Sequence, residues 1–527
     1  MLNHSFSLTP FNINIFQDGY TREFDYIIFH VEHSFLAITT MEKLLQDLEQ
    51  ENQAMISIPR LKQVQMPPPS SLASLELLKN YGSKFNKQKN KSNVETCVSP
   101  QKLSTEDIIR LAGTKYIQNS SEWHDNNLYI PYGTVLGSLL SEEENEQVEL
   151  AQFVLAAAER VGCQQFERAN MLLSHFHLMN ESGNIGSTVQ RLLFHFSQAL
   201  QERINRETGR GKMKLHRSNE RNKETELIDK MELDTNIVVK CHQKIPFNQV
   251  MQFAGVQAIV EHVASQTKIH LIHLNIGCGV MGTCFMQALV DRKEKPVEIL
   301  KITAIGFSNK AKLEEIGKSL TSFAESLNLP FLYNIVFVED AMEIKLDQFE
   351  IEYDEAVAIY SPCLLRTMVS NSDGLENLMK VIRKMKPFIM IVLELEANHN
   401  SPLFANRFVE ALFFYSAFFD CVDTCIKEDY ECRVIMEAIL SEGIRNIVGL
   451  EDEERKVRNV KIDVWRRFFA RYRMVETGFS ESSIYQANLV AKKFDCGKFC
   501  TIDKNGNCLI IGWKGTPLHS ISAWKFL

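Results

Sequence analysis

The chain has 527 residues, of which 45% are apolar and 24% are charged. This length is enough for one large domain with a tail, or for two or three smaller domains, each with a buried core. The net charge of −8 at pH 7 excludes a protein whose whole surface is built to bind phosphate backbones. Any contact with nucleic acid therefore has to be local or made through a partner.

The opening residues and the apolar segments indicate a soluble, intracellular protein. The N-terminal stretch MLNHSFSLTPFNINIF lacks the charged start, the apolar centre and the small-residue cleavage site of a secretory signal. No apolar run approaches the roughly 20 residues that a membrane-spanning helix needs. We therefore expect no association with a membrane.

The twelve cysteines are scattered along the chain, and several stand inside apolar runs, where a reduced thiol behaves as a small apolar side chain. Two groups come nearest to a metal-binding spacing. They are Cys421, Cys425 and Cys432, and Cys496, Cys500 and Cys508. Neither group contains a C-x-x-C pair or a companion pair of histidines, so we expect reduced cysteines and no bound metal.

Residues 1–140 alternate short apolar pieces with polar and turn-rich ones, such as MPPPSS at 66–71 and KFNKQKNKSN at 84–93. This composition is typical of a variable, partly disordered arm. The segment MEKLLQDLEQ at 41–50 places its apolar side chains on one helical face. Such a face either docks a partner or forms an isolated amphipathic turn.

Helical patterns begin at Ser141, where SEEENEQVELAQFVLAAAERV offers a helix cap, acidic residues in the first turn and then an apolar stripe. Two further stripes follow. The three stripes consist of Val148, Ala151, Val154, Leu155 and Ala158, then Phe166, Ala169, Leu173 and Phe176, then Val189, Leu192, Leu193, Phe196 and Leu200. The spacing predicts a bundle or cap of three helices.

The segment RETGRGKMKLHRSNERNK at 206–223 carries seven Lys or Arg residues. It indicates a solvated basic linker. A nuclear import signal or a phosphate contact is the functional hypothesis, and a plain surface loop is the simpler one. Residues 141–230 are thus predicted to form a helical cap followed by a basic linker.

From about residue 245 the pattern changes to strands that alternate with helices. Five apolar segments, IHLIHLNIG, VEILKITAIGF, FLYNIVFVE, EAVAIYS and FIMIVLELE, are separated by helical stretches near 285–291, 313–327 and 375–384. This alternation predicts a parallel sheet with helices on both faces.

The end of the chain differs, because KFCTIDKNGNCLIIGWK has two strand-like runs around Asn505 and Gly506, a dipeptide that favours a tight hairpin turn. Five parallel strands closed by an antiparallel hairpin form the strand plan of the Rossmann-like methyltransferases. Residues 245–527 are therefore predicted to form an α/β core of that type, with cap insertions.

The first predicted strand runs into the pattern G-x-G-x-x-G, formed by Gly277, Gly279 and Gly282. In a dinucleotide or adenosyl site such a turn lets the backbone approach the ligand, and an acid at the end of the second strand holds the ribose hydroxyls. Here the second strand ends at Gly306, and Asn275 stands where methyltransferase loops tend to carry an acid. We interpret the loop as degenerate and expect no cofactor. A methyltransferase-like protein that binds S-adenosylmethionine or a nucleotide is the alternative.

The end of the fourth strand also lacks catalytic residues. Nitrogen methyltransferases use Asp or Asn followed by two prolines and an aromatic residue there, whereas this chain has Ser361, Pro362 and Cys363. No G-x-S-x-G elbow, P-loop or H-E-x-x-H motif occurs in the sequence. We expect a protein that is not an enzyme.

An acid/base site is imaginable at the end of the fifth strand, where ELEANHNS places Glu394, Glu396 and His399 close together. Parallel sheets bind their ligands at this edge. The simpler interpretation, which we favour, is that the neighbouring asparagines and Ser401 end the strand and cap a helix ahead of Pro402.

The segment WRRFFARYR at 465–473 is the best candidate for phosphate contact, because Arg466, Arg467, Arg471 and Arg473 are interleaved with aromatic residues. The alternative is an amphipathic helix whose aromatic residues pack into the core while the arginines stay solvated or pair with acids. We favour the alternative.

Several motifs, found in the family's order, resemble those of the plant GRAS transcriptional regulators. The stretch at 269–273 is similar to the VHIID signature, 396–420 to the PFYRE region, 442–455 to the Arg-Asn segment, and the C-terminal residues to the SAW element. The matching residues are Ile269, His270, Leu271, Ile272, His273, Arg407, Glu410, Tyr415, Arg445, Asn446, Trp465, Arg466, Gly512, Trp513, Ser522, Ala523 and Trp524. The resemblance covers 141–527.

The chain departs from the family pattern at His273 and Asn275, where the family usually has aspartates. The N-terminal arm has neither the DELLA nor the TVHYNP motif of the gibberellin-signalling branch, although the rest looks closest to that branch and to scarecrow-like proteins. Regulation through a gibberellin receptor is therefore not supported.

The resemblance implies a nuclear regulator of transcription with a helical cap on a Rossmann-like core. Its implied partners are transcription factors and other GRAS proteins, with homo- or heterodimers among them, and direct DNA contact is a second implied mode. The leucine-rich helices that flank the VHIID segment are the implied protein-interaction faces.

Overall fold

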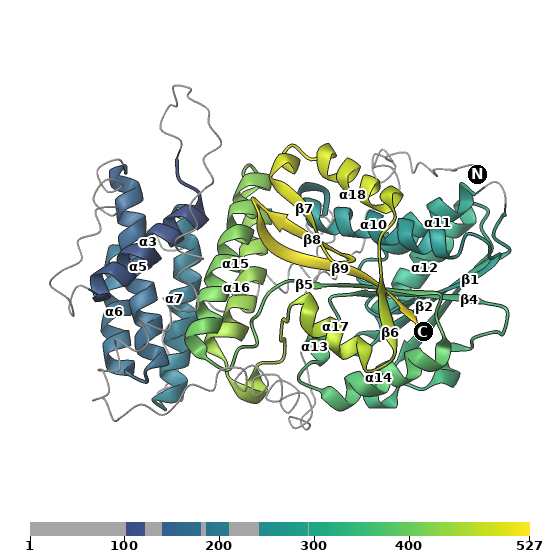
Figure 1. Cartoon of the computed structure of the whole chain (residues 1–527), viewed down its shortest axis with the longest axis horizontal. Helices are drawn as coiled ribbons and strands as arrows, with labels where there is room; N and C mark the ends of the chain where they lie inside the picture. Colours follow the sequence, from purple (N-terminus) through teal and green to yellow (C-terminus); the bar gives the residue numbers. More distant parts are fainter. Residues whose placement is uncertain (1–101, 122–139, 181–185, 210–241, 293–294) are drawn as a thin grey trace, which may run out of the picture.

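The structure of the chain is a computed structural model, and it describes residues 102–121, 140–180, 186–209, 242–292 and 295–527. Most of the basic segment at 206–223 and all of the patterns noted before residue 101 lie outside these ranges. The described residues form a group of helices on one side of an α/β part (Figure 1). We call the two parts the cap and the core.

The cap combines helices from two distant parts of the chain. Its elements are α3 (Thr105–Ser121), α5 (Glu142–Gly162), α6 (Phe166–Met179), α7 (Thr188–Glu207), α15 (Phe404–Cys425), α16 (Tyr430–Ile444) and the π-helical turn η6 (Arg445–Gly449). Helix α15 packs against α3, α5, α7 and α16, so the later segment completes the bundle that the earlier one begins. Figure 1 shows α15 and α16 between the first cap helices and the sheet.

The three cap helices predicted from the sequence are confirmed. Ser141 caps α5 in a capping box with Glu144, and Ser187 caps α7 in the same way with Gln190. Every residue of the three predicted stripes is buried except Phe166, which is partly buried. The apolar stripes therefore form part of the hydrophobic core of the cap.

Helix α3 lies within the range that the sequence analysis assigned to the variable arm. Its Ile108, Ile109 and Ala112 are buried, and the helix packs against α5 and α15. Glu106 accepts a hydrogen bond from the Thr516 hydroxyl of the last strand. The apolar stripe of α3 is short and its other face is charged, which explains why the sequence pattern did not separate it from the arm.

The core sheet has the predicted parallel strands. Its strands are β1 (Lys268–His273), β2 (Ile299–Gly306), β3 (Phe331–Phe337), β4 (Ala356–Pro362), β5 (Ile389–Leu395), β6 (Met474–Thr477), β7 (Cys500–Asn505), β8 (Cys508–Trp513) and β9 (Thr516–Phe526). The order in the described residues is β3-β2-β1-β4-β5-β9-β8-β7, with β6 paired to β9. Strands β1 to β5 are parallel, and β6 to β9 pair antiparallel.

Helices cover both faces of the sheet because the parallel strands are apolar on both faces. One face packs against α10 (Pro246–His262), α11 (Val280–Val290), α12 (Lys310–Ser326) and α18 (Glu481–Lys493), and the other against α13 (Leu365–Met368), α14 (Ser372–Met385) and α17 (Ile462–Ala470). Short 3-10 turns complete the connections: η4 (Ala341–Glu343), η5 (Leu346–Phe349), η7 (Asp452–Glu454) and η8 (Gly497–Phe499). This is the predicted Rossmann-like, methyltransferase-type architecture.

The C-terminal hairpin is confirmed, with one addition. Asn505 pairs with Cys508, so the turn consists of Gly506 and Asn507, and Gly506 has φ +60°. Strand β9 lies antiparallel between β5 and β8 and was not predicted as a separate strand. Its Ser520 and Ser522 are buried polar residues, and they interrupt the apolar pattern by which a strand is recognised.

Candidate functional site

The glycine turn after β1 has the backbone shape that the sequence predicted. Gly277 has φ +55° and Gly279 has φ +77°, a left-handed conformation that suits glycine. A Cβ on Gly279 would lie 3.0 Å from Ile316 Cγ2, and one on Gly282 would lie 3.1 Å from Leu320 Cδ2. Both contacts are with α12, so two of these glycines serve the close packing of α11 against α12.

The two positions where an acid would be expected in a cofactor site, Gly306 and Asn275, are not free to hold a ribose. A Cβ on Gly306, at the end of β2, would lie 2.2 Å from Leu313 Cδ1. The space for an acidic side chain is therefore filled by Leu313. The Asn275 amide donates to the Pro362 carbonyl at 3.3 Å.

His273 replaces the usual aspartate of the motif at the end of β1 and is only 2% exposed. Burial lowers the pKa of His273 to about 3, so the ring is neutral near pH 7. It packs edge-to-face on Tyr360 with 5.1 Å between the ring centres, and neither ring nitrogen has a hydrogen-bond partner. A neutral, buried ring does not supply the negative charge of the aspartate that the family usually has at this position.

The end of β4 is equally unsuited to methyl transfer. Ser361 is fully buried and its hydroxyl has no partner. Cys363 has φ +53°, and its main-chain N–H donates to the Leu393 carbonyl at 2.7 Å. Burial raises the pKa of the Cys363 thiol to about 11. The residues at this edge thus do not fit an adenosyl cofactor, because the acid positions are lost and the space beside β2 is filled.

The three residues of the imagined acid/base site hold loops together. The Glu394 carboxylate accepts a hydrogen bond from the Arg366 main-chain N–H at 3.3 Å, and Glu396 accepts one from the Ile462 N–H at 3.0 Å. The ring of His399 lies 3.0 Å from the Asn459 amide nitrogen and packs on an aromatic ring of α15. The strand-end part of the simpler interpretation agrees with these contacts. Its helix-cap part is wrong, because the N-cap of α15 is Leu403 and no side chain caps the helix.

His270, the second residue of the VHIID-like stretch, belongs to a buried network at the opposite end of the strands. Its Nδ1 lies 2.9 Å from a Glu355 carboxylate oxygen and its Nε2 lies 2.7 Å from the Thr303 hydroxyl. The Lys301 ammonium is 3.3 Å from the same carboxylate group. These contacts fasten β1, β2 and the start of β4 together.

The predicted phosphate-contact segment forms α17 and the turn after it. The aromatic residues face the core, and Trp465 stacks on Phe469. Arg466 makes a two-point contact with the Glu476 carboxylate at 3.1 and 3.2 Å, and Arg471 pairs with Glu376 at 3.2 Å.

Two of the four arginines are therefore engaged in ion pairs, while Arg467 and Arg473 are exposed. Contact of these arginines with nucleic acid stays a prediction.

Among the other family-motif residues, Glu410 joins the cap to the core, whereas Tyr415 and Arg445 make contacts within the cap. On α15, Glu410 pairs with Lys461 at 3.5 Å, and Tyr415 is buried against Phe196 of α7. In η6, the Arg445 guanidinium makes a two-point contact with Glu202 of α7 at 2.8 and 2.9 Å.

Asn446 binds the main chain of Val457 in both directions, since its amide donates to the Val457 carbonyl at 2.7 Å and accepts from the Val457 N–H at 3.4 Å. The π-helical turn therefore fixes the loop that follows it.

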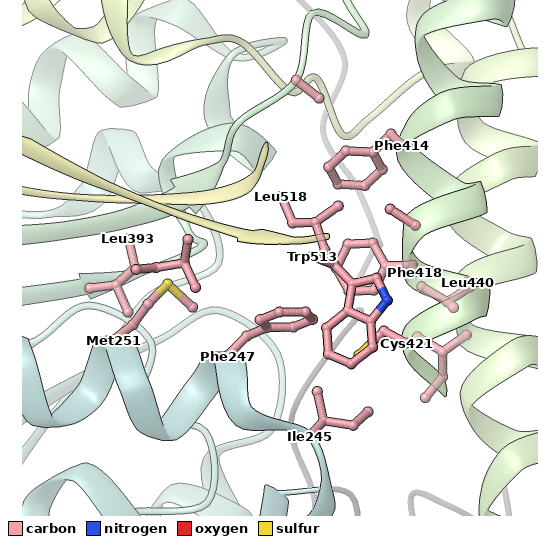
Figure 2. Packing of buried hydrophobic residues seen from close by; sticks show 14 of the residues in the cluster. Ile245, Phe247, Met251, Leu393, Phe414, Phe418, Cys421, Leu440, Trp513 and Leu518 are labelled. Carbon is pink, nitrogen blue, oxygen red and sulfur yellow. The ribbon is translucent and has the colours of Figure 1, made fainter. Parts of the chain in front are cut away.

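Trp513 of β8 is the centre of the apolar contact between cap and core. Its indole N–H donates to the Asp420 carboxylate of α15 at 2.6 Å, and its ring packs edge-to-face on Phe247 of α10. Figure 2 shows Trp513 between Phe247 on one side and Phe418 and Cys421 of α15 on the other. Trp524 of the SAW element packs on Phe469 on the far face of the sheet, beside Ser522 and Ala523.

Two cysteines of the first group noted in the sequence lie close together. Cys421 Sγ lies 3.8 Å from Cys425 Sγ on the next turn of α15, and both are free thiols. Cys432 and Cys508 are buried elsewhere. Among the described residues, no set of three or more His, Cys, Asp or Glu side chains is arranged to hold a metal ion. Nor does the described part of the chain contain a helix long and apolar enough to cross a membrane.

The fold and its sheet edge define a class of protein: a Rossmann-like, methyltransferase-type domain whose cofactor positions are filled and whose motif residues join a helical cap to the core. Comparison with known proteins agrees. Residues 150–525 match the GRAS domain family, so the chain belongs to that family. Its members are regulators rather than enzymes, and at this level the chain is a plant transcriptional regulator.

The curated relatives include the DELLA protein RGL1 of Arabidopsis thaliana, which is 26% identical over 73% of this chain and 71% of its own length. The GRAS family protein RAD1 of Medicago truncatula is 29% identical over 72% of each chain. Among solved structures, SCL7 of Oryza sativa superposes with a TM-score of 0.60 at 23% identity, over 71% of this chain and 99% of that one. This likeness supports the fold.

Proposed function

We propose that the chain acts in the nucleus by binding transcription factors and other GRAS proteins through its cap. The observation that carries this proposal is the outer face of α6. Ala169, Leu173 and Phe176 are buried against the rest of the cap, whereas Met171 and Leu178 are 62% and 73% exposed. A spacing of seven residues places these two side chains on the same helical face.

An amphipathic helix normally leaves charged residues on its solvent side, so two large apolar side chains on that side mark a surface that a partner can cover. Helix α6 lies at the end of the molecule farthest from the sheet (Figure 1). A partner bound there would not need to enter the core. The sheet edge supports the same proposal, because its residues do not fit an adenosyl cofactor.

The experiment is a two-hybrid screen of the full chain against plant transcription factors and GRAS proteins, followed by binding measurements with purified partners. The double substitution Met171→Lys and Leu178→Lys is expected to weaken partner binding about tenfold or more, since two buried apolar side chains are lost. Tyr485→Lys, at a residue of α18 that is 61% exposed, is the matched control. A protein that binds no such partner and is excluded from nuclei would contradict the proposal.

Direct DNA contact is a second mode that one observation favours, the exposure of Arg467 of α17 and of Arg473 in the turn after it. A mobility-shift assay at several salt concentrations tests it. Binding to DNA that weakens with salt, and weakens further when both arginines become Ala, would support this mode.

A further inference from the structure

A cluster of four arginines surrounds a single carboxylate where the cap meets the core. Arg203 comes from α7, Arg407 from α15, and Arg455 and Arg458 from the segment after η7. The guanidinium groups of Arg203 and Arg407 both contact the same oxygen of Glu451. We call these five residues the junction cluster.

The cluster is largely shielded from water. The side chains of Arg203 and Arg407 are 13% and 2% exposed, and Arg455 is 3% exposed. Glu451, with a side chain 27% exposed, forms the side nearest the solvent. Placing several cations at short range in such an environment is costly unless anions or hydrogen-bond acceptors compensate them.

The compensation is incomplete. Arg407 donates to the carbonyl groups of Ser401 and Pro402 at 2.9 and 3.2 Å, and Arg455 donates to that of His399. The Nε–H groups of Arg203, Arg407 and Arg455 are nevertheless all buried without a partner. Three unpaired donors on three guanidinium groups of one cluster are unusual in a folded protein.

The charges around the cluster also indicate that its positive charge is not fully balanced. Burial, together with the neighbouring Arg407 and Arg458, lowers the pKa of Arg455 to about 9, while Glu451 opposes them. Glu207 is a second acid that contacts the cluster, and the other acids nearby are already used. Glu202 contacts Arg206 and Arg445, Glu454 contacts Arg206, and Glu207 lies 3.7 Å from Arg203 at the surface.

We propose that the junction cluster is a binding site for a small phosphate-class oxyanion. Guanidinium groups bind tetrahedral oxyanions by paired, charge-assisted hydrogen bonds, and such an anion supplies the acceptors that the three Nε–H groups lack. A small anion suits the site better than a nucleic acid, because a duplex backbone is bound by solvent-exposed cations on an open surface. The bound anion ties α7 and α15 to the 451–458 segment and so stabilises the cap on the core.

The test is phosphate binding by the full chain, measured by calorimetry and by thermal unfolding at constant ionic strength. Inorganic phosphate is expected to bind saturably and to raise the unfolding temperature, while chloride does neither. Inorganic sulfate serves as a second tetrahedral oxyanion and is expected to bind saturably as well.

Arg455→Met removes one guanidinium but keeps an apolar chain of similar length. It is expected to weaken phosphate binding about tenfold or more, as the loss of charge-assisted hydrogen bonds requires. Arg203→Met, at a more exposed position, gives the same test if Arg455→Met does not fold, and Arg383→Met, at an exposed residue of α14, is the matched control.

Absence of saturable binding by both anions would overturn the proposal, as would equal binding by wild type and by both cluster variants. Binding of duplex DNA at the cluster without binding of either small anion would also overturn it, in favour of a nucleic-acid site. Each result is independent of whether α6 binds protein partners.

Discussion

The carboxyl edge of the sheet and the junction between cap and core differ in their polar chemistry: the edge lacks its usual charged groups, and the junction is rich in them. At the edge, Leu313 occupies the space of a lost acid and His273 is a neutral ring in an apolar setting. At the junction, arginines that are almost fully buried share one carboxylate, Glu451. An α/β fold usually concentrates its polar chemistry at the carboxyl edge of its strands. Here that chemistry lies where the two parts of the molecule meet.

The difference shows what holds the domain in one piece. Trp513 and the Arg445 contact with Glu202 connect segments far apart in the sequence. The edge residues are held mainly by single hydrogen bonds to the main chain. Substitutions at the junction should therefore reduce stability more than substitutions at the edge, and the following predictions test this ordering.

The largest effect is expected for Trp513→Ala. The side chain is fully buried between α10 and α15, and removal of a buried tryptophan costs about 3–5 kcal/mol of unfolding free energy. Urea unfolding at equilibrium measures the change. Trp513→Phe should lose clearly less, and similar losses for the two variants would show that the indole does not carry the contact.

Glu451→Gln is expected to lower the unfolding free energy by about 2–3 kcal/mol, because it leaves Arg203 and Arg407 without their shared carboxylate. The carboxylate is partly exposed, so the loss should be smaller than for a fully buried ion pair. The arginines hold the pKa of Glu451 below its usual range. Its contribution is therefore present above the unfolded pKa near 4.5 and lost as the pH falls through the lower folded value.

Glu453→Gln, at an exposed position in the same segment, should change the unfolding free energy by less than about 0.5 kcal/mol. Equal effects at 451 and 453 would count against the junction cluster.

Glu394→Gln, at the sheet edge, should increase the stability of the protein at high pH, whereas Glu451→Gln should decrease it. Burial raises the pKa of Glu394 to about 7, so the folded state keeps a proton that the unfolded state releases near pH 4.5. The wild type therefore loses stability as the pH rises from about 4.5 to 7, and the loss is complete above that range. The variant should be more stable by about 1–2 kcal/mol at pH 8 and equal to wild type near pH 4. A variant less stable at both pH values would contradict the assignment.

The smallest effect is expected for Arg467→Ala and Arg473→Ala. Both side chains are exposed, so each change should alter the unfolding free energy by less than about 0.5 kcal/mol. If they contact DNA, each loss should reduce the salt-dependence slope of binding by about one. Unchanged slopes would exclude both residues from a DNA interface.

Much of the fold could be predicted from the sequence because its elements carry local signals. The strands β1 to β5 are continuous apolar runs, and Ser141 and Ser187 begin helices with recognisable caps. Strand β9 and helix α3 could not be predicted as easily. Buried serines interrupt the pattern of β9, and only three buried apolar residues mark α3.

The site was predictable where it depends on residues near each other in the chain. The missing acids at Asn275 and Gly306 could be read directly, and Leu313, which fills the space beside Gly306, explains that loss in three dimensions. The junction cluster could not be predicted, because Arg203 and Arg455 lie about 250 residues apart and no local motif connects them.

Isothermal titration of the full chain with S-adenosylmethionine tests the central claim most directly, namely that the fold of a cofactor-binding domain is kept here without its cofactor site. We predict no saturable binding tighter than about 1 mM, because the edge lacks the acids that hold the ligand and Leu313 occupies the position beside Gly306. Saturable binding in the micromolar range would contradict the account and would restore the sheet edge as the functional centre of the molecule.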